Sequence, residues 1–164
     1  MGYSVDGRKW ASGDCRLNLG RPGIDVTWRS CAKNAMALWN GASANFKFTE
    51  DPTARDDIDA YDNGRWNGWL GMTWTSPTAS GSHLLSVRTV INLFYEWSPA
   101  HPHVLPSDTA GPYNLETAMA HEFGHALHLG EDTSGARTMM HPTICPGEVR
   151  GLHSDDIAGV RHLY

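Results

Sequence analysis

The sequence predicts an α+β fold with a mixed, twisted β-sheet, formed by a single domain over residues 1–164. Three observations lead to this prediction. The length of 164 residues suits one domain. A hydrophobic content of 40% with only 19% charged residues provides a sizeable core. Strand-like alternation and one helical pattern come first, and two further helical patterns follow a proline-rich segment, an order typical of α+β folds.

The first part of the chain contains short strands and one amphipathic helix. A strand is expected at residues 15–19, ended by the glycines and proline of residues 20–23. A helix is expected over residues 26–42, because apolar side chains recur there at helical spacing. These are Ala32, Ala35, Met36 and Trp39. Alternation of apolar and polar residues predicts strands at residues 46–49 and 57–61. Two more strands are expected near residues 69–75 and 85–94.

Two helices are expected after a long connection. Four prolines mark residues 98–113 as a surface segment without regular structure. Asn114 is a good N-cap for the second helix, and Glu116 suits its first turn. Ser154 is the expected N-cap of the last helix, which presents apolar residues on one side. The apolar side chains of these two helices are Leu115, Ala118, Met119, Phe123, Ala126, Leu127, Ile157, Val160 and Leu163.

Charge and hydropathy exclude several classes of partner. The net charge of −5 leaves no basic face for nucleic acid or anionic lipid. No run of 18 apolar residues is present that could cross a membrane. The opening residues, MGYSVDGRKW, lack the apolar core of a signal peptide. Few lysines, many tryptophans and two cysteines 16 residues apart, Cys15 and Cys31, are typical of exported proteins, so we expect a processed, secreted, extracellular monomer.

The second predicted helix carries a metal-binding pattern, His121-Glu122-Phe123-Gly124-His125. Residues four apart on a helix lie about 6 Å apart on nearly the same face, so both imidazoles can reach one metal ion. Glu122 lies beside that face, where its carboxylate can hold a water without binding the metal. The sequence therefore predicts a Zn²⁺ site with His121 and His125 as ligands and Glu122 as general base.

Three motifs in order resemble the metzincin metalloproteases and, within them, the matrixins. They are HEFGHALHLGED at residues 121–132, TMMHP at residues 138–142 and LHSDDIAGV at residues 152–160. The resemblance implies a metzincin-like fold, with two main helices above an active-site cleft and a C-terminal helix. It also implies a zinc-dependent endopeptidase that acts on proteins or peptides. By the same analogy, residues 143–152 form the wall of the S1′ pocket, and the strand near residues 85–94 pairs with the substrate.

The zinc-binding stretch departs from the family pattern at two positions. His128 stands where the family has a glycine that turns the chain off the helix, and Glu131 stands where a third His or Asp ligand is expected. Glu131 is our favoured third ligand, because Zn²⁺ accepts carboxylate oxygens. Gly130 is expected to make the turn instead, as a left-handed residue. The alternatives for the third ligand are Asp132, His128, His141 and His153.

The methionine-containing turn admits two alignments with the family. If Met140 is the family methionine, it packs beneath the metal ligands, and His141 replaces a tyrosine. If Met139 is, His141 lies two residues after it, where some metzincins place a tyrosine near the metal. Both alignments place His141 near the cleft, as an oxyanion-stabilising donor or as an exposed loop residue.

Other features leave alternatives open. Acidic residues gather at residues 50–62, where they can supply a structural Ca²⁺ site of the kind found in the resembled proteases or form a solvated strand edge. The three cysteines permit three pairings; Cys15 with Cys31 is one, and Cys145 is our candidate for the unpaired thiol.

An alternative function for the whole chain is that of a catalytically weak binding module with a structural metal site. Retention of Glu122 favours the enzyme, because a structural site has no use for a general base.

Overall fold

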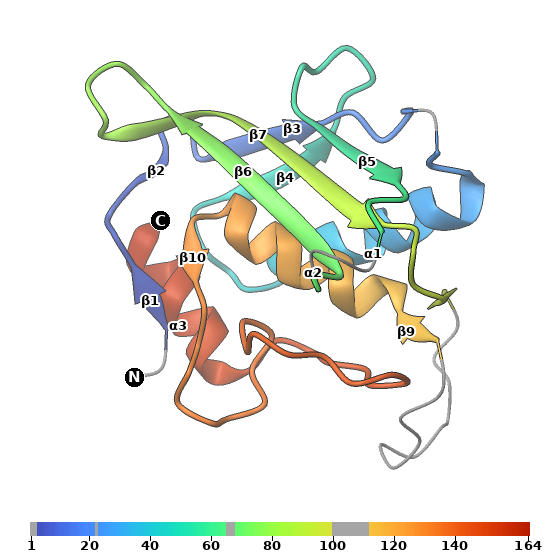
Figure 1. The fold of residues 1–164 in the computed structure, drawn as a ribbon. Coiled ribbons are helices and arrows are strands. Elements are labelled where there is room, and N and C mark those ends of the chain that lie inside the picture. Colours follow the sequence, from blue (N-terminus) through green and yellow to red (C-terminus); the bar gives the residue numbers. More distant parts are fainter. Residues whose placement is uncertain (1–2, 22, 65–67, 100–111) are drawn as a thin grey trace.

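The computed structural model describes residues 3–21, 23–64, 68–99 and 112–164, and shows the expected α+β fold (Figure 1). Its elements in chain order are β1 (Ser4–Val5), β2 (Lys9–Trp10), β3 (Asp14–Leu17), α1 (Val26–Asn40), β4 (Lys47–Glu50), β5 (Asp57–Tyr61), β6 (Gly71–Pro77), β7 (His83–Asn92), β8 (Trp97–Ser98), β9 (Tyr113–Asn114), α2 (Leu115–Ala126), β10 (Leu129–Gly130) and α3 (Ser154–Leu163). The predicted helices and the strands from β3 to β7 are present within a few residues of their expected bounds.

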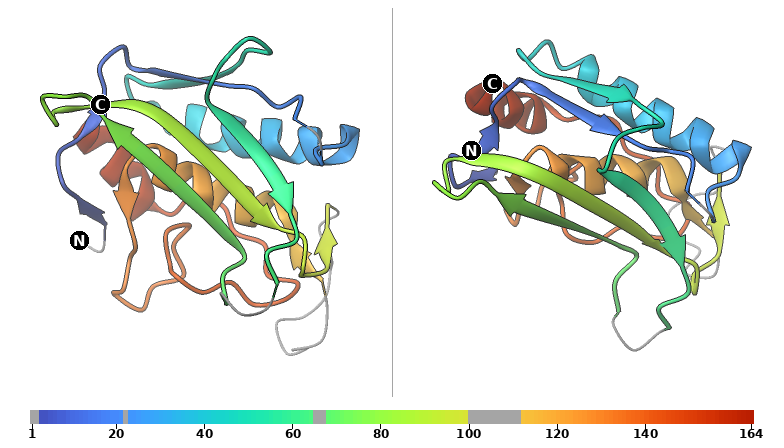
Figure 2. Two further views of the ribbon diagram at one scale, coloured as in Figure 1. Left: turned by 45° about the horizontal axis from the view of Figure 1, so that its top comes forward. Right: turned by 90° about the horizontal axis from the view of Figure 1, so that it is seen from above.

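The main sheet is mixed and is built around β7. On one edge, β7 pairs in parallel with β2 and with β5. On its other edge it pairs antiparallel with β6 over almost its whole length. The parallel pair β3 and β4 is joined to β5 by a single bridge between Asn18 and Asp57. The views in Figure 2 show β6, β7 and β5 side by side, with β6 outermost.

Helices α1 and α2 lie side by side, with α2 packed against β6 and β7 and α1 packed against β4 (Figures 1 and 2). Asp25 caps α1 by accepting hydrogen bonds from the backbone N–H groups of Thr27 and Trp28. The indole of Trp39 donates to the carbonyl of Ala120 at 2.8 Å, and the indole of Trp10 donates to that of Ala126 at 2.9 Å. These two hydrogen bonds connect α2 to the rest of the core. They therefore fix the position of the helix that carries the metal-binding pattern.

The ends of the two later helices test the capping predictions. Asn114 caps α2, with Glu116 in the first turn, as expected. The prediction of Ser154 as the cap of α3 is wrong by one residue, because His153 fills that role. Its side chain accepts from the N–H of Asp155, and the Asp156 carboxylate accepts from the N–H of His153, a reciprocal capping box.

The connection expected at residues 98–113 is regular at both ends. Trp97–Ser98 and Tyr113–Asn114 form the short parallel pair β8 and β9, which contradicts the prediction there. The remaining residues, 100–111, with His101 and His103, lie outside the described part of the chain. Within the described residues, no helix is long and apolar enough to cross a membrane.

The structure also bears on two other predictions, the pairing of the cysteines and the role of the acidic residues at 50–62. Cys15, Cys31 and Cys145 are all free thiols, so the Cys15–Cys31 disulfide is not present. The carboxylates of residues 50–62 contact cations and backbone groups rather than gathering around a shared centre. Examples are Glu50 with Arg29 and Lys33, and Asp57 with Arg21. This arrangement matches the solvated strand edge better than a Ca²⁺ site.

Candidate metal centre and catalytic cleft

Helix α2 presents His121 and His125 on one face, and the backbone orients both rings. The Nδ1 atom of His121 lies 2.8 Å from the carbonyl oxygen of Met139, and Nδ1 of His125 lies 2.9 Å from that of Leu129. Because a carbonyl oxygen only accepts, each Nδ1 carries the proton and donates it. In the neutral imidazoles the lone pair is therefore on Nε2, the atom left available to bind a metal.

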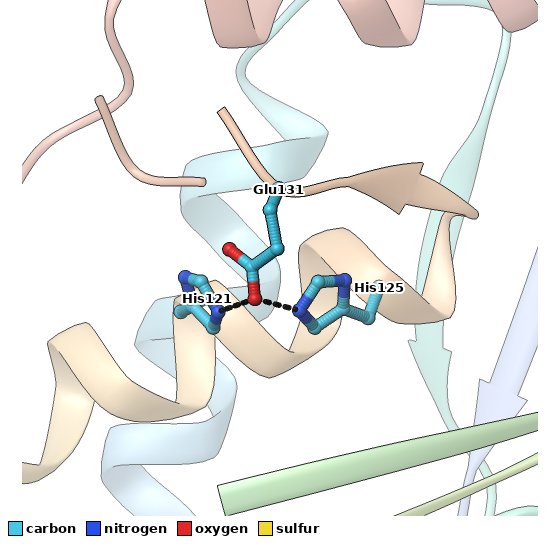
Figure 3. A group of neighbouring side chains, drawn as sticks. All are labelled: His121, His125 and Glu131. Carbon is cyan, nitrogen blue, oxygen red and sulfur yellow. Dashed lines mark ion pairs between the residues drawn. The ribbon is translucent and has the colours of Figure 1, made fainter. Parts of the chain in front are cut away.

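Glu131 completes the group from the opposite side, as Figure 3 shows. Its Oε1 atom lies 3.7 Å from Nε2 of His121 and 3.4 Å from Nε2 of His125. Ligand atoms of all three side chains lie within 4.8 Å of one another. Two ligands bound tetrahedrally at about 2.0 Å from Zn²⁺ are separated by about 3.3 Å. The distances from Glu131 to the two Nε2 atoms are close to this value, so the three side chains are placed to share one zinc ion after local adjustment.

The other candidates for third ligand lie elsewhere or have other partners. The Asp132 carboxylate is buried and accepts from the N–H of Ser134 and the hydroxyl of Thr138. His153 caps α3. Nδ1 of His141 accepts from the N–H of Thr143, and His141 is not among the residues that line the cleft. Among the described residues, the one group of three or more suitable side chains is His121, His125 and Glu131.

His128 makes the turn that brings Glu131 back to the two histidines. Helix α2 ends at Ala126 with Leu127 as its C-cap, and His128 follows with a φ of 73°, in the left-handed region. The prediction that Gly130 makes this turn is therefore wrong, because Gly130 lies in β10 and pairs with Ser4 of β1. Nε2 of His128 lies 2.9 Å from the carboxylate of Asp6, so the N-terminal segment covers the turn. Long-range pairing with β1 fixes this geometry.

The left-handed backbone at His128 predicts a difference between two variants. An L-residue with a Cβ is strained at this φ, whereas glycine is not. His128→Gly and His128→Ala both lose the contact with Asp6, so the comparison isolates the backbone. We expect the glycine variant to be more stable by about 1 kcal/mol in urea unfolding. An alanine variant at least as stable as the glycine variant would contradict the left-handed assignment.

The methionine turn lies directly beneath α2. Gly124 is packed so closely that an added Cβ would lie 2.1 Å from Sδ of Met140 and 2.9 Å from the ring of Trp39. Met140 is therefore the methionine that packs against α2 at Gly124, while the carbonyl of Met139 accepts from Nδ1 of His121. The carboxylate of Asp156 accepts from the N–H groups of both methionines and anchors the turn to α3.

Glu122 is almost fully buried between α2 and β6, with 5% of its surface exposed. Burial raises its pKa, against the opposing effects of His121, His125 and the hydroxyl of Thr73. A carboxylate with a raised pKa is a stronger base than an exposed one, which suits proton transfer near neutral pH. Contacts from Thr73 and Gly71 of β6 were not predicted from the sequence, because they depend on how β6 lies over α2.

Burial and neighbouring charges also act in opposite directions on the pKa values of Glu131 and His125. Burial raises the pKa of this carboxyl, but its contacts with the imidazoles of His121 and His125 outweigh burial and lower the pKa to about 2. Burial lowers the pKa of His125, yet the carboxylates of Glu131 and Glu122 produce a net increase. Glu131 is therefore ionised at neutral pH, and protons compete with a metal for the imidazole nitrogens.

These side chains lie in a cleft of about 720 Å³. Tyr113, Pro142, Thr143 and Ile144 are among its lining residues, so of the pocket wall expected at residues 143–152 only Thr143 and Ile144 line the cleft. The predicted substrate-pairing strand, residues 85–94, is wrong because β7 is already paired on both edges. Strand β6 lines the cleft and, among the described residues, pairs only with β7. The sequence pattern alone does not reveal which strand is outermost.

Comparison with known proteins agrees with this geometry. The profile of the matrixin family matches residues 24–164. Metalloendoproteinase 1 of Glycine max is 28% identical over 177 residues, which cover 99% of this chain and 54% of that protein. Matrix metalloproteinase-9 of Canis lupus familiaris is 44% identical over 52 residues, covering 32% of this chain and 7% of that protein. The chain thus spans about half the length of the Glycine max relative.

The matched range contains all three helices, the methionine turn and every residue of the candidate metal centre. The fold and the motif order agree with the same assignment over the whole C-terminal part of the chain. This chain is a member of the matrixin family, a family of metalloproteases.

Proposed function

We propose that this chain is a zinc-dependent endopeptidase, with His121, His125 and Glu131 as zinc ligands and Glu122 as general base. The observation that carries the proposal is the convergence of the three ligand atoms within 4.8 Å, in a cleft that also contains the Glu122 carboxylate. Two imidazoles and one carboxylate form a donor set typical of catalytic zinc, and they leave a coordination position open. Membership of the matrixin family supports the same function.

Glu122 and the backbone around the two histidines have separate roles in the proposed peptide hydrolysis. A bound Zn²⁺ would lower the pKa of water and polarise the substrate carbonyl. Glu122 takes a proton from the attacking water and passes it to the leaving amine. Its burial keeps competing solvent away and supports the raised pKa that this role needs. The carbonyls of Met139 and Leu129 keep both imidazoles in the tautomer that binds metal.

The substrate is proposed to lie as an extended peptide along the edge of β6 that faces away from β7 and that pairs with no other strand of the described residues. An exposed strand edge offers backbone N–H and C=O groups at the spacing that a peptide needs. The side chain after the scissile bond would enter the pocket beside Pro142, Thr143 and Ile144. Ile144 and Ala118 make this part of the cleft apolar, so we expect a preference for an apolar residue there.

The rest of the proposal concerns the whole molecule. We take residues 1–164 as one catalytic domain that acts as a secreted, extracellular monomer on proteins or peptides. Neither nucleic acid nor a membrane is a proposed partner, because the net charge of −5 disfavours both. Structural Ca²⁺ is not part of the proposal, since Glu50 contacts Arg29 and Lys33, and Asp57 contacts Arg21.

Metal content and casein hydrolysis, measured together, test this function. We expect the protein to bind one Zn²⁺ per chain, to lose activity in a chelator and to regain it with added Zn²⁺. Glu131→Ala is expected to lose both zinc and activity, because it removes a ligand. Asp132→Asn is the matched control and is expected to keep zinc, because its carboxylate faces Thr138 and Ser134.

Two results would contradict this proposal. Zinc lost from the Asp132 variant alone would transfer the third-ligand role to Asp132. Zinc bound by a wild-type protein that cleaves no casein or unstructured peptide would favour the binding module with a structural metal site.

A further inference from the structure

A threonine of β6 contacts the catalytic carboxylate directly. The Thr73 hydroxyl lies 2.8 Å from Oε2 of Glu122 and 3.1 Å from the backbone carbonyl oxygen of the same residue. Both atoms of Glu122 are acceptors when the carboxylate is ionised, so the hydroxyl is the donor. A hydrogen bond to a charged acceptor is about twice as strong as a neutral one. Thr73 therefore binds one specific oxygen of the buried base.

A second threonine completes the donor chain. Thr89 of β7 is the cross-strand partner of Thr73, and the two hydroxyl oxygens lie 3.0 Å apart. Thr89 is fully buried. Since the single proton of Thr73 is directed to Glu122, the Thr89 hydroxyl donates to the Thr73 oxygen. Successive hydrogen bonds in this order polarise one another and strengthen the final one to the carboxylate.

A glycine on the same strand confines the other side of the carboxylate. Gly71 lies two residues before Thr73 and so faces the same side of β6. An added Cβ on Gly71 would lie 2.8 Å from both Cγ and Oε1 of Glu122. Strand β6 therefore has no side chain at Gly71, where the Glu122 carboxylate lies. At Thr73 it has a hydroxyl that donates to one oxygen of this carboxylate.

We propose that Thr73 is a positioning residue for proton transfer: with Thr89 behind it and Gly71 beside it, it holds Oε2 of Glu122, so that Oε1 takes the proton from water. This inference rests on the proposed function, in which Glu122 is the general base. Thr73 does not touch the reacting atoms and acts through Glu122. A base that must lie within hydrogen-bond reach of its proton loses efficiency when its carboxylate is free to rotate.

The test compares Thr73→Val, which removes the hydroxyl at nearly constant shape, with Thr73→Ser, which retains it. We expect Thr73→Val to lower kcat about tenfold on a fluorogenic peptide, with KM within twofold of wild type and unchanged zinc content. Thr73→Ser is expected to restore most of kcat. The matched control is Thr49→Val on the exposed face of β4, which should change neither constant. Thermal unfolding of each variant checks that it is folded.

The Glu122→Gln background separates this inference from the proposed function. If Glu122 is the base and Thr73 acts through it, Thr73→Val should lower the residual rate of Glu122→Gln no further. A Thr73→Val variant with wild-type kcat, or a Thr73→Ser variant as slow as Thr73→Val, would overturn the positioning role alone. Glu122→Gln at wild-type rate would instead overturn the proposed function. If Thr73→Val does not fold, Thr73→Ala takes its place in the comparison with serine.

Discussion

Glu122→Gln is expected to bind zinc as the wild type does and to lose peptide hydrolysis by at least about a hundredfold, because general acid–base catalysis contributes about 10²–10⁴ in rate. The amide has nearly the shape of the carboxylate, and its oxygen can still accept from the Thr73 hydroxyl. It has no lone pair basic enough to take the proton. The two zinc-binding histidines are not altered.

The same substitution is expected to leave the protein at least as stable as the wild type. Glu122 is buried, and burial raises its pKa, so its charged form is disfavoured in the folded state. A neutral amide avoids that penalty, and the melting temperature should be unchanged or higher. Glu116→Gln, in the first turn of the same helix, is the matched control and should keep full activity. Hydrolysis by Glu122→Gln at the wild-type rate would contradict the role of Glu122.

Arg150→Met is expected to cause the largest loss of stability, about 3 kcal/mol or more. The Arg150 side chain is only 4% exposed. Its guanidinium donates to the carbonyls of Thr138, His141 and Thr143 and to the carboxylate of Glu148. Methionine fills similar space but leaves Glu148 buried without its main partner. The melting temperature should fall by about 10 °C.

A surface arginine provides the control for this effect. Arg137 contacts the same Glu148 carboxylate at 3.4 Å, but its side chain is 65% exposed. Solvent screens such a pair, so Arg137→Met should change stability by less than about 1 kcal/mol. Glu148→Gln combined with Arg150→Met should recover part of the loss, because no charge is then left unpaired. Equal effects of Arg137→Met and Arg150→Met would contradict the role of burial.

Loss of Arg150 should also change the substrate selectivity of the cleft. The guanidinium binds Thr143 from inside the turn, next to the pocket-lining Ile144. Without the guanidinium, Thr143 and Ile144 are no longer held in place. Selectivity between apolar substrate side chains should therefore fall more than kcat does. Peptides that differ only in the residue after the scissile bond measure this directly.

Features set by local sequence were predicted well. The helical spacing of Ala32, Ala35, Met36 and Trp39 identified α1, and all four side chains are buried. The H-E-x-x-H spacing placed His121 and His125 on one face of α2 because four residues make just over one turn. Glu131 was favoured because it stands at the third-ligand position of the resembled family's pattern, and the structure brings it to the two imidazoles. These are short-range relations.

Features set by long-range pairing were missed. The left-handed turn at His128 depends on β1 lying beside β10 and on Asp6 reaching the imidazole, two contacts made by residues more than 100 positions away. The outer position of β6 depends on its antiparallel register with β7, which also brings Thr73 over Glu122. Alternation identifies a strand but not its neighbours, so neither contact could be read from the local pattern.

The central claim is that His121, His125 and Glu131 together bind the catalytic zinc. Anomalous X-ray diffraction at the zinc edge, from crystals of the zinc-loaded protein, tests it most directly. We expect one strong peak about 2.0–2.2 Å from Nε2 of His121, Nε2 of His125 and a carboxylate oxygen of Glu131. A peak bound instead by Asp132, His128 or His141, or no peak between the two imidazoles, would contradict the account.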